Sequence, residues 1–127
     1  MKIYTSYFAN VRNLPDGCVP ISISRFPPKG WTGLTYPPLF PPQELLFMSK
    51  QGKIDNRDYI LTYKHQVLDN LHKDGVVRDI EEMTHGQDAV LICYEKPSDF
   101  CHRKIVAKWM GIHEITNKKT TEETSLF

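Results

Sequence analysis

The segment from Asp88 to Tyr94 is an almost unbroken apolar run near the C-terminal end of the chain. A short continuous run of this kind is typical of a strand at the centre of a parallel sheet, where both faces are covered. Such a strand needs packed layers above and below it, so it constrains the fold more than any other segment. We therefore predict a sheet with this strand in its interior.

Other strand and helix patterns precede and follow this run. β-branched and aromatic side chains predict strands at Ile3–Phe8 and Val19–Ser24, and a short strand at His113–Ile115. Apolar positions at helical spacing predict helices at Gln43–Lys50, Arg57–His72 (with Gly75 just beyond its end), Val76–His85, and from a cap at Ser98 or Asp99 onward. Strands that alternate with helices indicate an α/β domain with a small, mainly parallel sheet and helices on both faces.

Two segments differ from this alternation. Residues 25–42 hold six of the nine prolines, interleaved with Phe26, Trp31, Tyr36 and Phe40, and predict a stiff, extended loop without regular structure. A loop of this length is more often functional than idle, although a loop that packs its own aromatic rings over the core gives the same pattern. We expect one domain over residues 1–116 and a polar, disordered tail over residues 117–127.

Composition excludes several broad classes of protein. A net charge of +1 gives no overall field that would attract nucleic acid or anionic membrane, although a local basic patch stays compatible with it. We expect no membrane-spanning segment and no signal peptide. Three cysteines are too few, and odd in number, for a disulfide scaffold, which favours a reducing, cytoplasmic location.

Reactive side chains gather immediately after the apolar run. Cys93 and Glu95 end the predicted strand, and Cys101, His102 and Arg103 open the predicted helix that follows. In parallel sheets, ligands bind beyond the carboxyl ends of the strands. This strand–loop–helix junction is therefore the strongest candidate site in the sequence.

Cys101 is the stronger nucleophile candidate of the two thiols. The first turn of a helix has free N–H groups and a positive dipole end, and both favour a thiolate. His102 or Glu95 would accept its proton. Cys101 is accordingly expected to be the most easily alkylated cysteine of the native protein. The alternative is that Cys101 and Cys93 are inert residues that only pack in the core.

Arg103 stands at an unfavourable position, because a cation in the first turn of a helix opposes the helix dipole. We expect it at the exposed start of the helix. Either Asp99 or Glu95 pairs with it, or Arg103, Arg25 and the helix N-terminus hold a bound anion. The other strand ends would add Tyr7 and Ser24 to the anion site, and the proline-rich loop would add Trp31.

A metal site is not predicted. Cys93, Cys101 and His102 are soft ligands, but neither a Cys-x-x-Cys nor a paired-histidine spacing is present, and adjacent Cys and His rarely ligate one ion. Phosphate-loop, dinucleotide-binding and serine-elbow motifs are absent as well, so the sequence names no cofactor.

The run Leu-Ile-Cys-Tyr-Glu-Lys-Pro at 91–97, followed by Cys-His-Arg at 101–103, resembles the signature of the domain of unknown function 488 family. Tyr4 to Phe8 and the strand that ends at Arg25 are similar to that family too, so the resemblance spans most of residues 1–115. The chain departs from it at Ser6 to Asn10, where many members have a histidine, and before Arg25, where many have an acid. The resemblance implies a small α/β domain with a polar site and no particular reaction.

Two hypotheses of different class follow. In the first, a small enzyme acts on a phosphorylated or nucleotide-like substrate that Arg25 and Arg103 bind, with Glu95, His102 or Cys101 as acid, base or nucleophile. In the second, the same cations serve a non-catalytic module for an anionic ligand or nucleic acid, with stacking faces from Trp31, Tyr36 and Phe40. A weaker variant takes the proline-rich run at 36–42 as a ligand of a partner domain. The oligomeric state is left open.

Overall fold

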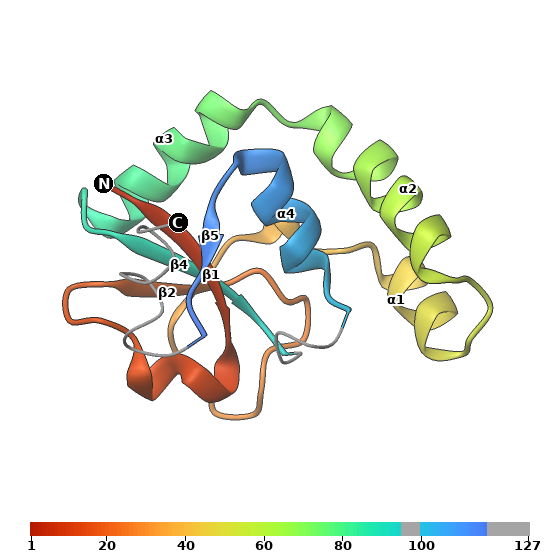
Figure 1. The fold of residues 1–127 in the computed structure, drawn as a ribbon, viewed down its shortest axis with the longest axis horizontal. Helices are drawn as coiled ribbons and strands as arrows, with labels where there is room; N and C mark the ends of the chain where they lie inside the picture. Colours follow the sequence, from red (N-terminus) through yellow and green to blue (C-terminus); the bar gives the residue numbers. More distant parts are fainter. Residues whose placement is uncertain (95–99, 117–127) are drawn as a thin grey trace.

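The strand β4 (Ala89–Cys93), with all five residues buried, lies in the middle of a five-stranded sheet. The structure is a computed structural model, and it describes residues 1–94 and 100–116. The other strands are β1 (Ile3–Tyr7), β2 (Val19–Ser22), β3 (Leu34–Thr35) and β5 (His113–Glu114). The order is β3-β2-β4-β1-β5, and every pairing is parallel (Figure 1). The predicted α/β class is confirmed.

The register aligns the carboxyl ends of the three central strands. Tyr7 of β1 pairs with Cys93 of β4, and Ser22 of β2 pairs with Ile92. The polar segments after these strands therefore begin at one edge of the sheet. This edge is where a parallel α/β sheet binds ligands.

Pro20 is the second residue of β2, a strand with a neighbour on each side, although a proline cannot donate to the ladder. The N–H of Val19 donates to the Asp88 carbonyl on the β4 side. Because successive residues of a strand alternate in direction, the nitrogen of Pro20 points away from β4. On that side, β3 begins to pair with β2 only at Ile21. The missing N–H of Pro20 therefore removes no hydrogen bond between β2 and β3.

The two faces of the sheet are covered differently. One face packs against all four α-helices: α1 (Gln43–Lys50), α2 (Asn56–Gln66), α3 (Lys73–Thr84) and α4 (His102–Met110). The other packs against the 3-10 helix η1 (Phe8–Asn13) and Trp31. Two further 3-10 helices are η2 (Pro37–Leu39) and η3 (Leu68–Asn70). Figure 1 shows α4 above the sheet and η1 below it.

Helix α1 has the predicted bounds, but the helix predicted at Arg57–His72 does not. It ends at Gln66, and η3 continues the chain. Leu68 of η3 is buried in the same core as α2, so the apolar pattern in the sequence continues beyond the last residue of the helix. Gly75, which we expected beyond the helix end, lies in the first turn of α3.

The loop at residues 25–42 contains regular structure after all, because β3 and η2 lie within it. The backbone N–H of Tyr36 donates to the Ser22 carbonyl and fixes this segment beside β2. The predicted tail at residues 117–127 lies outside the described residues. In the described part of the chain, no helix combines the length and apolar character that crossing a membrane requires.

Candidate functional site

A pocket of about 390 Å³ lies at the carboxyl edge of the sheet. Cys93, Cys101 and His102 line it together with Ser24, Lys50, Tyr59 and Phe100. The rings of Tyr59 and Phe100 meet edge to face, with centroids 5.0 Å apart. The pocket thus combines reactive side chains from the β4–α4 junction with an aromatic wall and one exposed lysine.

Cys93 and Cys101 form a disulfide in the structure, which overturns our expectation of free thiols. Cys93 is the last residue of β4, and Cys101 is the N-cap residue of α4, one position before the predicted first turn. Packing of α4 against β4 brings the two sulfur atoms together. Among the three cysteines only Cys18 is free, so the prediction that Cys101 is the most easily alkylated cysteine applies only after reduction.

The Sγ atoms of both cysteines and a ring nitrogen of His102 lie within 4.8 Å of one another. Thiolates and a neutral imidazole in such a group can hold a soft metal ion. In this structure the sulfur atoms are bonded to each other and carry no thiolate charge. We therefore assign no metal to the cluster.

The ring of His102 is fixed in one orientation and one tautomer. Its Nε2 lies 2.7 Å from the carbonyl oxygen of Ile23, which can only accept, so Nε2 carries the hydrogen and donates it. Burial lowers the pKa of His102 to about 4, and the charge of Arg103 acts in the same direction. The imidazole is therefore neutral at pH 7, and the lone pair of Nδ1 is left 3.8 Å from the Sγ of Cys101.

Arg103 is fully buried, against our expectation of an exposed residue at the helix start. Its Nε donates to the Glu114 carboxylate at 2.8 Å, and its Nη1 donates to the Sγ of Cys93 at 3.3 Å. Its Nη2 has no hydrogen-bond partner among residues 1–94 and 100–116. Glu114 offsets the unfavourable helix position of the cation, while the guanidinium would stabilise a thiolate at Cys93.

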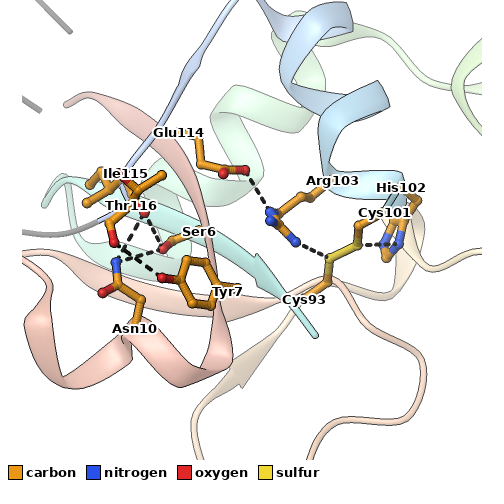
Figure 2. A network of polar contacts seen from close by, with 10 residues as sticks. All are labelled: Ser6, Tyr7, Asn10, Cys93, Cys101, His102, Arg103, Glu114, Ile115 and Thr116. Atoms are coloured by element: carbon orange, nitrogen blue, oxygen red, sulfur yellow. Dashed lines mark hydrogen bonds and ion pairs between the residues drawn. A yellow bond between two sulfur atoms is a disulfide. The ribbon is translucent and has the colours of Figure 1, made fainter. Parts of the chain in front are cut away.

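A polar network holds the segment that carries Glu114 in place. The hydroxyl of Ser6 and the amide Nδ2 of Asn10 both donate to the Ile115 carbonyl, and the hydroxyl of Tyr7 donates to the Thr116 carbonyl. Figure 2 shows this network on one side of Arg103 and the two sulfur atoms on the other. The end of β5 is thus tied to β1 and η1, and Glu114 faces Arg103.

Comparison with known families gives one match. A family model described as the active DUF488-N3 subclade matches residues 3–113. The chain belongs to the DUF488 family. No curated protein and no solved structure matches it. The match covers β1 to β4, the α-helices α1 to α4 and the first residue of β5 in this DUF488 chain, and it includes the β4–α4 junction.

The structure brings three of the predicted site residues of this DUF488 protein into the pocket: Ser24, Cys101 and His102. Arg103 lies directly behind them, on the far side of Cys93. Glu95, like the predicted caps Ser98 and Asp99, lies outside the described residues.

Three other predicted residues do not line the pocket. The Nε of Arg25 donates to the Pro41 carbonyl at 2.8 Å, and its guanidinium lies over the Phe40 ring. Tyr7 lies beside Arg103, with 5.7 Å between its ring centroid and the guanidinium carbon. Trp31 packs against Phe8 on the opposite face of the sheet.

Sequence reasoning missed Lys50, Tyr59 and Glu114. The first two reach the pocket from α1 and α2, and no local pattern marks them. Glu114 did carry a signal, because it is a charged residue inside a predicted strand, between Ile112 and Ile115. A charge that is partly buried in a strand favours a partner of opposite sign.

Proposed function

We propose that the pocket binds a small anionic, phosphate- or nucleotide-like ligand and that Cys101, once reduced, acts on it as a nucleophile. One observation carries the proposal: Cys101 and His102 both line the pocket, and the Sγ of Cys101 lies 3.8 Å from the unprotonated Nδ1 of His102. A thiol beside a fixed base is the arrangement that nucleophilic catalysis requires. The N-cap position on α4 adds the positive end of a helix dipole.

The groups that would bind the anion differ from those first expected. Neither Arg25 nor Arg103 lines the pocket, whereas Lys50 does. The free N–H groups at the start of α4 also favour a negative charge there. Phe100, which is only partly buried, offers an aromatic surface to a nucleobase or another flat group, and the buried Tyr59 ring supports it edge to face. Glu95 keeps its proposed role as a second acid or base.

A cytoplasmic location is part of this proposal. There glutathione and thioredoxin keep most thiols reduced, and the disulfides that do form are usually transient and catalytic or redox-sensing. The Cys93–Cys101 bond would then be one state of the site, and the dithiol the other.

Anion binding predicts a thermal shift in the reduced protein. At a ligand concentration ten times Kd, mass action adds about 1.4 kcal/mol to the free energy of unfolding and raises Tm by roughly 4 °C. Inorganic phosphate, AMP and ADP are the probes, and Lys50→Ala should remove most of the shift. Lys53→Ala is the matched control, because this exposed lysine does not line the pocket. The proposed anion site is wrong if no probe shifts Tm at millimolar concentration, or if Lys50→Ala shifts as the wild type does.

A second candidate function is nucleic-acid binding at a different surface. Lys64, Lys73, Lys108 and Trp109 line a hollow of about 510 Å³ between α2 and α4. The Nζ of Lys73 lies 5.7 Å from the centre of the Trp109 ring. Lysines around a partly buried aromatic ring such as Trp109 suit single-stranded nucleic acid. Tyr36, by contrast, is buried and cannot stack on a base.

A short single-stranded oligonucleotide added to the same thermal-shift series separates the two candidates. The oligonucleotide should then raise Tm if nucleic-acid binding is the function. Lys64→Ala and Lys108→Ala should weaken this shift, and Lys50→Ala should leave it intact.

A further inference from the structure

We infer that Cys93 is the resolving partner of Cys101, and that the pocket therefore carries out the two-electron reduction of a small disulfide. The inference rests on the proposed function for the identity of the nucleophile, and it adds the reaction class and the substrate class. Its starting point is that both cysteines line one pocket and that their sulfur atoms are bonded to each other.

The surroundings of the two sulfur atoms are different, as the two roles require. The Sγ of Cys101 faces a neutral base, the Nδ1 of His102, which can take up its proton. The Sγ of Cys93 faces a fixed cation, because the Nη1 of Arg103 donates to it at 3.3 Å. A base beside one thiol and a buried guanidinium beside the other are not needed by a disulfide that only links two segments. Both are useful if each sulfur must become a thiolate in turn.

The reaction balances in two steps. Cys101 loses its proton to solvent by way of the Nδ1 of His102, which stays neutral at pH 7, and the Cys101 thiolate attacks one sulfur of the substrate R–S–S–R′. The substrate S–S bond breaks, R′–S⁻ leaves with the bonding electron pair and takes up a proton from solvent, and Cys101 carries the mixed disulfide Cys101–S–S–R.

In the second step the Cys93 thiolate, stabilised by Arg103, attacks the Sγ of Cys101. The Cys93–Cys101 bond forms, and R–S⁻ leaves and takes up the proton that Cys93 released to solvent. Two electrons have passed from the protein dithiol to the substrate, which is now two thiols. The product state of the protein is the disulfide that the structure contains. An external dithiol reduces it for the next turn.

The shape and charge of the pocket indicate the substrate class. A volume of about 390 Å³ is within the range of small-molecule sites and far exceeds what a peroxide needs. Lys50 and the start of α4 favour a carboxylate, and Tyr59 and Phe100 favour apolar stems. These features fit a low-molecular-weight disulfide that bears carboxylate groups.

Glutathione disulfide is the probe for the test. The full chain is reduced with a phosphine, desalted, mixed with one equivalent of probe and quenched with acid for mass spectrometry. We expect the wild type to lose two thiols, form Cys93–Cys101 and release two equivalents of glutathione without a lasting adduct.

Cys93→Ser should stop at a mixed disulfide on Cys101 with one equivalent of glutathione released, and Cys93→Ala should do the same if serine disturbs folding. Cys101→Ser should react slower by roughly tenfold or more. Cys18→Ser is the matched control and should behave as the wild type.

The inference is overturned if Cys93→Ser traps no adduct on Cys101, if Cys101→Ser reacts at the wild-type rate, or if hydrogen peroxide oxidises the pair while glutathione disulfide does not. If anions shift Tm and Cys101 is reactive, but glutathione disulfide is not reduced, this inference is refuted and the proposed function stands. If Cys101 is unreactive, both the inference and the proposed function are refuted.

Discussion

Replacing Glu114 with glutamine should lower the free energy of unfolding by about 3 kcal/mol, because the substitution leaves the Arg103 cation buried without its counter-charge. The guanidinium is fully buried, and Glu114 is its ion-pair partner in the structure. Arg103 also lies in the first turn of α4, where the helix dipole is unfavourable to a cation. Glutamine keeps the size and shape of the side chain, so the loss reports the missing charge.

Urea denaturation at pH 7 measures this loss. Glu81→Gln, which removes an exposed acid on α3, is the matched control and should change stability by no more than about 0.5 kcal/mol. The double variant Arg103→Met with Glu114→Gln should recover most of the loss, because no unpaired buried charge is left. Equal effects of Glu114→Gln and Glu81→Gln would show that the ion pair does not stabilise the fold.

Acidification from pH 7 toward pH 4 should remove roughly 3 kcal/mol of stability through His102 alone. The pKa of His102 is about 4 in the folded protein, whereas the ordinary value for an exposed histidine is 6.5. Between these values the unfolded chain binds the proton and the folded chain does not, so unfolding becomes more favourable as the pH falls. The contribution is complete above pH 6.5 and is lost on approach to pH 4.

Urea denaturation at pH 7 and near pH 4 tests this for the wild type and for His102→Gln, whose side-chain amide can still donate to the Ile23 carbonyl. Other groups titrate in both proteins, so the difference between their losses of stability reports His102 alone. We expect acidification to lower the free energy of unfolding of His102→Gln by roughly 3 kcal/mol less than that of the wild type. His65→Gln is the control, because His65 is 85% exposed and pairs only with Asp69 at the surface. Parallel losses in all three proteins would show that His102 is not buried as a neutral base.

The fold followed from local patterns to a large extent. The apolar run that ends at Cys93 predicted an interior strand of a parallel sheet, and it is β4. The bounds of α1 were predicted correctly, since helix-forming residues lie between Pro42 and Gly52. The end of α2 was predicted wrongly. Leu68 is buried in the core from a 3-10 turn, and an α-helix would give the same apolar spacing.

The sequence placed the candidate site at the junction where the structure has a pocket, but it did not give the contacts there. Cys93 and the Cys-His-Arg run pointed to this junction because strand ends in parallel sheets carry ligand sites. The disulfide depends on how closely α4 packs on β4, and the Arg103–Glu114 pair depends on β5 lying next to β1. These are tertiary distances, and no residue spacing encodes them. Consequently, Arg103→Ala, which the sequence suggested would spare the fold, should instead destabilise it.

The reactivity of Cys101 in the reduced protein tests the central claim most directly. Brief iodoacetamide treatment at pH 7 after removal of the disulfide, followed by peptide mass spectrometry, compares Cys101 with Cys18. Burial raises the pKa of the Cys18 thiol, with Asp88 acting in the same direction, whereas Cys101 has a helix N-terminus and a neutral imidazole beside it. The account predicts that Cys101 is labelled faster than Cys18 and that phosphate or ADP slows only the labelling of Cys101. Labelling confined to Cys18, with Cys101 unreactive in the reduced protein, would contradict it.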